Sequence, residues 1–417
     1  MTEGAPGAVT VATSDARVSR FTIIGIALAS ALVPLNSTMV AVALPKLARA
    51  FDIGRGHAGL LVTVYLVVML FGQPIAGRVS DVLGSKRVAV VSLLGFAMCS
   101  GAAALSPSFP WLVGWRGTQA VFAAALAPSV QSMLRSVTRP TERSHAFGIL
   151  GSVIGVGAAS GPIVGGLLLG SFGWKSIFVV NVPAAAIALA VLVTVKVGGP
   201  SAESAALRPS DIGGSSVVST SPAQRSGLLR PSYLAAFATQ ALANLGQYSL
   251  LLIAPIVLDR RHWGSRETGL ALSALTIGLI VMGPPGGRFG DRSGNRRAIG
   301  RGLSVGAFGA ALLLPFGISV APAMLIVALA MFGMGLGFAS SSIIAAGLEA
   351  VPSNQTGVAA GLLSAGRYVG SIVASLLLTA YVADDGSGGR VMYVAASLAV
   401  LLAVAASRGL PDRVAAG

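Results

Sequence analysis

Twelve long apolar stretches constrain the fold of this chain more than any other feature of its sequence. Each is long enough to cross the hydrocarbon layer of a membrane, about 30 Å, as a helix. The first six lie at residues 21–44, 58–77, 88–106, 111–134, 146–170 and 175–197, and the second six at 231–258, 267–286, 299–319, 321–347, 356–382 and 390–408. The sequence therefore predicts an all-α polytopic membrane protein, with twelve transmembrane helices in two six-helix halves.

The composition excludes several other classes of protein. Of the 417 residues, 54% are hydrophobic and only 10% are charged, whereas a soluble domain has about 25% charged residues. The single cysteine, Cys99, rules out a disulfide framework. We find no phosphate-binding G-x-x-x-x-G-K-[ST] loop and no H-E-x-x-H zinc motif. We therefore expect neither an enzyme nor a protein with a metal or cofactor.

The net charge of +15 would suggest nucleic acid in a soluble protein, but the topology accounts for it in a different way. With the N-terminus placed in the cytoplasm, nineteen Lys and Arg residues fall on cytoplasmic connections and eight on outer ones. Cytoplasmic loops of membrane proteins carry this excess. We therefore predict a cell-membrane protein with both termini in the cytoplasm, embedded in the lipid bilayer, with no nucleic-acid partner.

One polar segment divides the chain into its two halves. Residues 198–230 are rich in Ser, Gly and Pro and have little to bury, which is typical of a linker. The predicted organisation is a cytoplasmic N-terminal tail (1–20), an N-terminal six-helix half (21–197), a cytoplasmic linker (198–230), a C-terminal six-helix half (231–408) and a C-terminal tail (409–417).

Two connections repeat one pattern at matching places in the two halves. Residues 77–87 read GRVSDVLGSKR and residues 287–297 read GRFGDRSGNRR, an offset of 210 residues. Both fit G-x-x-x-D-x-x-G-x-[KR]-[KR]. Glycine permits a sharp reversal, and the carboxylate can face basic groups or a helix N-terminus. We interpret both as short turns that belong to a conformational switch, with a merely solvated basic loop as the alternative; the residues concerned are Gly77, Asp81, Gly84, Arg87 and Asp291.

With these two turns, the chain resembles the major facilitator superfamily of transporters over essentially its whole length. Within the fifth stretch, Gly148 and a later glycine row are similar to the antiporter motif G-x8-G-x3-G-P-x2-G-G of that family; the row is Gly157, Gly161, Pro162, Gly165 and Gly166. Arg116 and Gln119 resemble its R-x-x-Q-G motif, with Ala120 in place of the last glycine. The resemblance implies a twelve-span member of the drug/proton antiporter branch. Small residues let another helix approach closely, and proline favours a bend, so we assign this row to the switch.

Polar residues inside the apolar stretches indicate a substrate cavity, because such residues usually face the interior of a helix bundle. Four of them follow i, i+4, i+7, i+8 spacing in the seventh stretch and so share one face: Gln240, Asn244, Gln247 and Tyr248. The other candidates for substrate binding are Asn36, Arg116, Gln119, Asn181 and Arg367. For any single Asn or Gln, a helix–helix hydrogen bond is an equally good interpretation.

The acidic residues are informative because none falls in the middle of a stretch. A proton carrier inside a membrane is normally Asp, Glu or His. Asn36 stands where the related antiporters have an acid. A cavity with Arg116 and Arg367 and no buried acid is electropositive, which favours a neutral or anionic substrate.

The function that the sequence favours is export of a small amphipathic molecule, a drug-like compound or a metabolite, by alternating access. We expect a monomer in which protons drive antiport. The alternative is a facilitator or an importer of a neutral or anionic solute, without an intramembrane proton carrier.

Overall fold

The structure, a computed structural model, describes residues 20–138, 143–195, 229–352, 356–382 and 389–410. The N-terminal half consists of α1 (Arg20–Ala50), α2 (Arg55–Ala58), α3 (Leu60–Leu83), α4 (Ser85–Ala104), α5 (Phe109–Val137), α6 (Arg143–Phe172), α7 (Ser176–Val179) and α8 (Asn181–Thr194). The C-terminal half consists of α11 (Pro231–Arg260), α12 (Ser265–Ser293), α13 (Asn295–Ala311), the 3-10 turn η3 (Gly317–Ser319), α14 (Pro322–Glu349), α15 (Thr356–Tyr381) and α16 (Gly389–Ser407).

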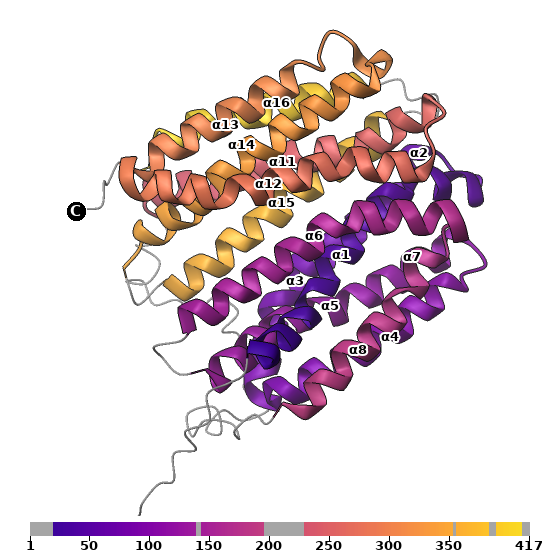
Figure 1. The fold of residues 1–417 in the computed structure, drawn as a ribbon, viewed down its shortest axis with the longest axis vertical. Coiled ribbons are helices and arrows are strands. Elements are labelled where there is room, and N and C mark those ends of the chain that lie inside the picture. The colour runs from indigo at the N-terminus through magenta and orange to yellow at the C-terminus, as the bar shows by residue number, and fades with distance from the viewer. Residues whose placement is uncertain (1–19, 139–142, 196–228, 353–355, 383–388, 411–417) are drawn as a thin grey trace, which may run out of the picture.

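Long helices dominate both halves, which confirms the predicted fold class. Figure 1 shows the halves as two bundles side by side, one coloured indigo to magenta and the other salmon to yellow. Among the described residues, eleven helices are long and apolar enough to cross a membrane. The predicted stretch that is missing from these eleven is the ninth, 299–319, which corresponds to α13, a helix of 17 residues. Its length is about 26 Å at a rise of 1.5 Å per residue, and the chain continues through a further turn at 312–316.

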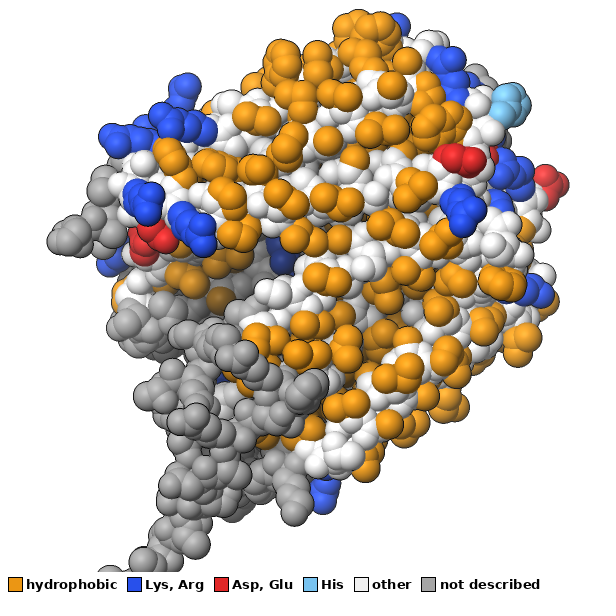
Figure 2. Space-filling model, in the orientation of Figure 1, with side chains coloured by type: hydrophobic (Ala, Val, Ile, Leu, Met, Phe, Trp, Pro, Cys, Tyr) orange, Lys and Arg blue, Asp and Glu red, His pale blue; other side chains and the backbone are white. Residues whose placement is uncertain are grey.

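The helices alternate in direction, so each end of the molecule carries one set of connections. We call the end where α3 meets α4, α12 meets α13 and α11 begins the linker end, and the opposite end the far end. Figure 2 shows a broad hydrophobic surface between basic side chains at both ends. Leucines, valines and phenylalanines are exposed all along it. A surface of this kind is stable only against lipid.

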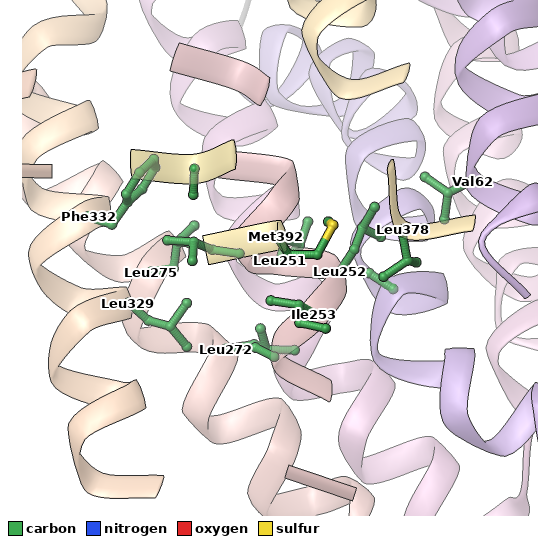
Figure 3. Close-up of a cluster of buried hydrophobic side chains, with 14 of the residues drawn as sticks. Val62, Leu251, Leu252, Ile253, Leu272, Leu275, Leu329, Phe332, Leu378 and Met392 are labelled. Atoms are coloured by element: carbon green, nitrogen blue, oxygen red, sulfur yellow. The ribbon is translucent and has the colours of Figure 1, made fainter. Parts of the chain in front are cut away.

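The buried core connects the two halves. One apolar cluster joins Val62 of α3 to Leu252 of α11 and Leu378 of α15, and Figure 3 shows these side chains among others from α12, α14 and α16. A second cluster belongs mainly to the N-terminal half and contains Phe96 and Leu126. The first cluster therefore holds the halves together as well as filling the C-terminal one.

The two repeated turns have the conformation that the sequence predicts. Gly84 separates α3 from α4 with φ of 90°, and Gly294 separates α12 from α13 with φ of 95°. Both ψ values are also large and positive, 128° and 140°. Only glycine adopts such a backbone without steric strain, so these glycines fix where each helix pair reverses.

Candidate functional site

A buried arginine of α5 is surrounded by polar and aromatic residues of neighbouring helices. Arg116 of α5 is only 1% exposed, and Asn36 of α1 and Gln119 of α5 beside it are fully buried. The Arg116 Nη1 donates hydrogen bonds to the Asn36 Oδ1 and, at 2.6 Å, to the Gln119 Oε1. The Gln119 amide in turn donates to the Ser100 hydroxyl of α4. The structure thus brings together three of the predicted site residues, from two different helices.

An aromatic ring completes the surroundings of this guanidinium. The Arg116 Cζ lies 3.9 Å from the ring centroid of Tyr65 on α3, a cation–π distance. Three buried polar atoms of the group have no hydrogen-bond partner within the described residues: the Arg116 Nε, the Asn36 Nδ2 and the Tyr65 hydroxyl. Buried polar atoms are rarely left unpaired, so this cluster has unused capacity to bind a polar ligand. We call Asn36, Tyr65, Arg116 and Gln119 the arginine cluster.

The C-terminal half adds polar residues next to the arginine cluster. Tyr248 of α11 hydrogen-bonds Ser37 of α1 and interacts electrostatically with Arg116. The Gln73 amide of α3 donates to the Tyr368 hydroxyl of α15 at 2.9 Å. Arg367 adjoins both tyrosines. The site therefore lies between the two halves and is built from both.

Arg367 differs from Arg116 in its environment. Arg116 lies about two turns into α5 and is buried, whereas Arg367 lies near the middle of α15 and is exposed. Its electrostatic interactions with Tyr248 and Tyr368 place it near the polar residues that lie between the halves. Figure 2 shows a hollow between the halves next to the grey residues.

Two of the remaining predicted substrate residues, Asn181 and Asn244, bond to a backbone carbonyl four residues earlier in the chain. The Asn181 amide nitrogen donates to the Ile177 carbonyl at 3.2 Å, and the Asn244 amide nitrogen donates to the Gln240 carbonyl at 3.0 Å. Gln240 and Asn244 are each 7% exposed, and Gln247 is half-buried. Of the polar face predicted on α11, Tyr248 has an observed contact with the N-terminal half.

Carboxylates are distant from the arginine cluster within the described part of the chain. The acidic residues there lie within a few residues of helix ends or in connections; on the transmembrane helices they are Asp81, Asp259, Glu267, Asp291 and Glu349. The hydrogen-bonding partners of Arg116 are neutral. The cluster therefore has a net positive charge away from water.

The glycine row of α6 packs against two different helices. A Cβ at Gly157 would lie 2.8 Å from the Ala31 carbonyl of α1, and one at Gly165 would lie 3.1 Å from the Met39 Cα. At Gly161 a Cβ would overlap Thr38. Gly166 instead faces the other half, where a Cβ would lie 2.5 Å from the Ser265 carbonyl and 3.0 Å from the Gly269 Cα of α12. Most of the row therefore joins α6 to α1, and its end joins the two halves.

Pro162 also belongs to the contact between the halves. A Cβ at Gly269 would overlap the Pro162 carbonyl. Nearby, the Thr276 hydroxyl of α12 lies 3.4 Å from the Ala159 carbonyl. A larger residue in place of Gly269 or Thr276 would keep α12 from approaching the Pro162 and Ala159 carbonyls this closely.

The other predicted switch residues lie around the two turns at the linker end. Arg87 and Asp291 are exposed, and Gly77 is half-buried. Asp81 falls in the last turn of α3, and its side chain lies outside the described residues. The adjacent Lys86 has a clear structural task, because its Nζ donates to the Val193 and Val195 carbonyls at the end of α8, at 2.8 and 2.7 Å.

An ionic contact at the far end was not predicted from the sequence. Asp259 of α11 accepts from Arg49 of α1 at 2.6 Å and from Arg55 of α2 at 3.1 Å. The Thr63 and Ser375 hydroxyls, on α3 and α15, lie 2.6 Å apart close by. A Cβ at Gly56 would lie 2.7 Å from the Val382 carbonyl. The halves are therefore in close contact at the far end, and the hollow of Figure 2 lies away from it.

Comparison with known proteins identifies the family. The sequence profile of the Major Facilitator Superfamily matches residues 26–375 and 236–416. The chain is 30% identical to the uncharacterized MFS-type transporter YvkA of Bacillus subtilis over 397 residues, which cover 85% of this chain and 89% of that protein. It is 26% identical to the multidrug resistance protein Stp of Mycobacterium tuberculosis, over 87% of this chain and 75% of Stp. It is 32% identical to the riboflavin transporter RibZ of Clostridioides difficile, over 37% of this chain and 34% of RibZ.

Solved structures have the same fold at low sequence identity. The D-xylose–proton symporter gives a TM-score of 0.74 at 14% identity and covers 94% of this chain and 98% of that one. A bacterial homologue of the human lysosomal transporter Spinster gives a TM-score of 0.73 at 16% identity, over 93% and 97%. With its two helical halves, its repeated turns and its glycine row, this chain belongs to the Major Facilitator Superfamily and is a multi-pass membrane transporter.

Proposed function

We propose that this transporter exports small amphipathic molecules that are neutral or anionic, and that they bind at the arginine cluster. The observation that carries the proposal is Arg116, a guanidinium 1% exposed whose hydrogen-bond partners are two neutral amide oxygens. An intramembrane ionisable residue marks a functional site by default. The positive charge of Arg116 gives that site a preference for neutral or anionic substrates.

The electrostatics of the cluster favour an anion over a cation. Removing an ionic group from water costs several kcal/mol unless another charge compensates it. Amide oxygens and the Tyr65 ring compensate Arg116 only in part, and a carboxylate or enolate on a substrate would complete the compensation. A cationic compound would instead meet Arg116 and, beside the hollow, Arg367. No acidic residue of the described chain lies between these two arginines. Aromatic substrate groups could contact the rings of Tyr65, Tyr248 and Tyr368.

The direction of transport is inferred from the relatives and from the glycine row. Stp is named as a multidrug resistance protein, which supports efflux. RibZ is named as a riboflavin transporter, which supports an uncharged or weakly charged aromatic substrate. The row from Gly157 to Gly166 resembles the antiporter motif of the family.

Alternating access requires that the two halves open at one end while they close at the other. The ionic contact of Asp259 and the packing of Gly166 on Gly269 support a state closed at the far end. We propose that the halves 21–197 and 231–408 rock as two bodies, that 198–230 links them, and that the protein acts as a monomer in the cell membrane. Both termini, and therefore the linker end, lie in the cytoplasm.

Proton antiport is the coupling that we propose. A second candidate, a facilitator or an importer, is favoured by one observation: no acid or histidine of the described residues lies at mid-depth in a helix. Coupling through Asp81, Glu349 or the substrate's own charge would reconcile antiport with this observation.

Flux into proteoliposomes tests the proposed substrate class. Purified protein is given anionic, neutral and cationic aromatic compounds of similar size. We expect transport of the first two, and for the anions a loss of at least tenfold in Arg116→Gln that Arg116→Lys partly restores. Arg266→Gln is the matched control, since Arg266 is exposed at the start of α12, away from the cluster. Preference for cations, or undiminished anion flux in Arg116→Gln, would refute the assignment.

The same proteoliposomes decide the coupling. An imposed pH gradient should accelerate wild-type flux and drive accumulation against the substrate gradient. Accumulation that never exceeds equilibrium, at any pH gradient, would favour the facilitator.

A further inference from the structure

A cavity lined by arginines lies at the linker end of the C-terminal half, distant from the substrate site. It has a volume of about 410 Å³ and lies between the start of α13 and the end of α16. Its lining consists of Arg296, Arg297, Gly300, Val404, Ser407 and Arg408. Three arginines, two from the start of α13 and one directly after the end of α16, therefore line one open space.

These arginines have no counter-ion within the described residues. The ion pairs found there belong to Asp259 at the far end. Arg297 makes one long hydrogen bond, 3.3 Å, to the Ser293 carbonyl. Three like charges around a cavity repel one another, and an anion in that cavity would relieve the repulsion.

The N-terminal half provides an internal comparison. Lys86 follows the first repeated turn, and Arg296 occupies the matching position, 210 residues later, after the second. The Lys86 ammonium group donates its hydrogen bonds to the final carbonyls of α8. Arg296 instead lines the open cavity against α16, the helix that matches α8 in the repeat. The matching basic residues therefore differ between the halves: Lys86 bonds backbone carbonyls, whereas Arg296 faces open space.

The cavity lies at the edge of a lipid-facing surface. On α16 the exposed residues Val394, Leu398, Leu401 and Leu402 form one stripe that ends at the exposed Arg408. On α13 a second basic residue, Arg301, follows Arg297 on the exposed face, and the exposed Val305 and Phe308 continue that face toward the middle of the membrane. Figure 2 shows the same arrangement, with basic side chains at the end of the hydrophobic surface. A molecule that fills the cavity can therefore extend apolar chains along both helices.

We propose that this cavity binds the phosphate headgroup of an anionic phospholipid from the membrane leaflet at the linker end. Arginine pairs with phosphate oxygens in bidentate geometry, and basic pockets between transmembrane helices on the cytoplasmic side bind such headgroups. The acyl chains lie on the apolar stripes of α13 and α16. A free inorganic anion shares the headgroup chemistry but would leave those stripes unused, so we commit to the lipid.

The test is native mass spectrometry of the full-length protein, delipidated and titrated with phosphatidylglycerol. Each basic residue next to an anionic headgroup contributes roughly a fivefold change in affinity. The triple variant R296Q/R297Q/R408Q should therefore bind phosphatidylglycerol roughly a hundredfold more weakly. The matched control is R230Q/R288Q/R292Q, which removes three exposed arginines from the same end but none from the cavity. It should lose less than about threefold.

Two competing ligands distinguish a bound phospholipid from a bound inorganic anion. Phosphatidylcholine should bind weakly to both proteins, and inorganic phosphate should not displace phosphatidylglycerol at equal concentration. Arg408→Gln alone, at an exposed position, should lose about fivefold and guards against misfolding of the triple variant. Equal losses in the triple variant and its control would overturn the proposal. Displacement by inorganic phosphate would also overturn it, because the cavity would then be a site for a soluble anion.

Discussion

Neutralising Asp259 should open the far end of the transporter. This carboxylate is 12% exposed and accepts from Arg49 and Arg55 of the other half. Lys46 interacts with it as well. In Asp259→Asn these three cations would lose the carboxylate that they share, so the state in which the halves meet at the far end loses stability. The opposite state, with the far end apart, loses nothing.

The size of the effect follows from the exposure of the two arginines. The Arg49 side chain is 56% exposed, so its pair with Asp259 contributes at most about 1 kcal/mol. Arg55 is 22% exposed and its pair is less screened by water. Together they should favour closure by roughly 1–2 kcal/mol, which changes the ratio of closed to open protein by a factor of about 5 to 30.

Cysteine labelling measures this ratio. The single native cysteine is buried and is replaced in Cys99→Ser. Ser375→Cys then places a thiol in the contact with Thr63, where Ser375 is fully buried. A membrane-impermeant maleimide should label this thiol about 5 to 30 times faster when Asp259→Asn is added. High salt should reduce the difference, because it screens the ion pairs that remain in the parent.

Glu267→Gln is the control, since Glu267 lies at the same end and is exposed. It should leave the labelling rate unchanged. If Asp259→Asn labels no faster than the parent at low salt, the ionic contact does not hold the far end closed and the role assigned to Asp259 is wrong.

Three further predictions concern packing and turns. Gly166→Val would place carbon against the Ser265 carbonyl of α12, so it should separate the halves at the far end and abolish most transport. Gly170→Ala is the control, because Gly170 has open space around it, and it should leave transport unchanged. Comparable flux in the two variants would contradict this prediction. Gly84→Ala forces alanine to φ of 90° and should cost about 1–3 kcal/mol, seen as a lower melting temperature, while Gly101→Ala in a helix interior should not lower it. Lys86→Met removes the two hydrogen bonds to the end of α8; hydrogen exchange there should accelerate as about 1 kcal/mol is lost, and unchanged exchange would show that water replaces them.

Much of the architecture could be predicted from the sequence because its causes are local. A run of about twenty apolar residues must form a helix in lipid, where each backbone polar group needs a partner within the helix. Gly84 and Gly294 were recognisable for a similar reason, since a left-handed turn depends on one residue. The glycine row of α6 was recognisable as a close-packing surface. Its division between α1 and α12 was not, because spacing along one helix does not identify the neighbour.

The candidate site was predictable in its residue types and less so in its geometry. Arg116, Asn36 and Gln119 could each be selected as polar residues in apolar stretches. One guanidinium nitrogen of Arg116 bonds both the Asn36 and the Gln119 amide oxygens. This geometry depends on how α1 and α5 pack, which no local pattern encodes. The same applies to Tyr248 and Ser37, which belong to different halves. On α11 the spacing predicts one polar face, yet the Asn244 amide bonds its own helix, because a helix carbonyl is always within reach.

By itself, the sequence determined that this chain crosses a membrane many times, reverses at two repeated turns and keeps carboxylates away from mid-membrane. These properties follow from hydropathy, glycine conformation and the position of charge along the chain. Only the tertiary structure decided that Asp259 meets Arg49 across the two halves, that Arg116 is buried while Arg367 is exposed, and that three arginines at the linker end surround a cavity. Each of these is a distance between residues far apart in the chain, and the packing of whole helices sets such distances.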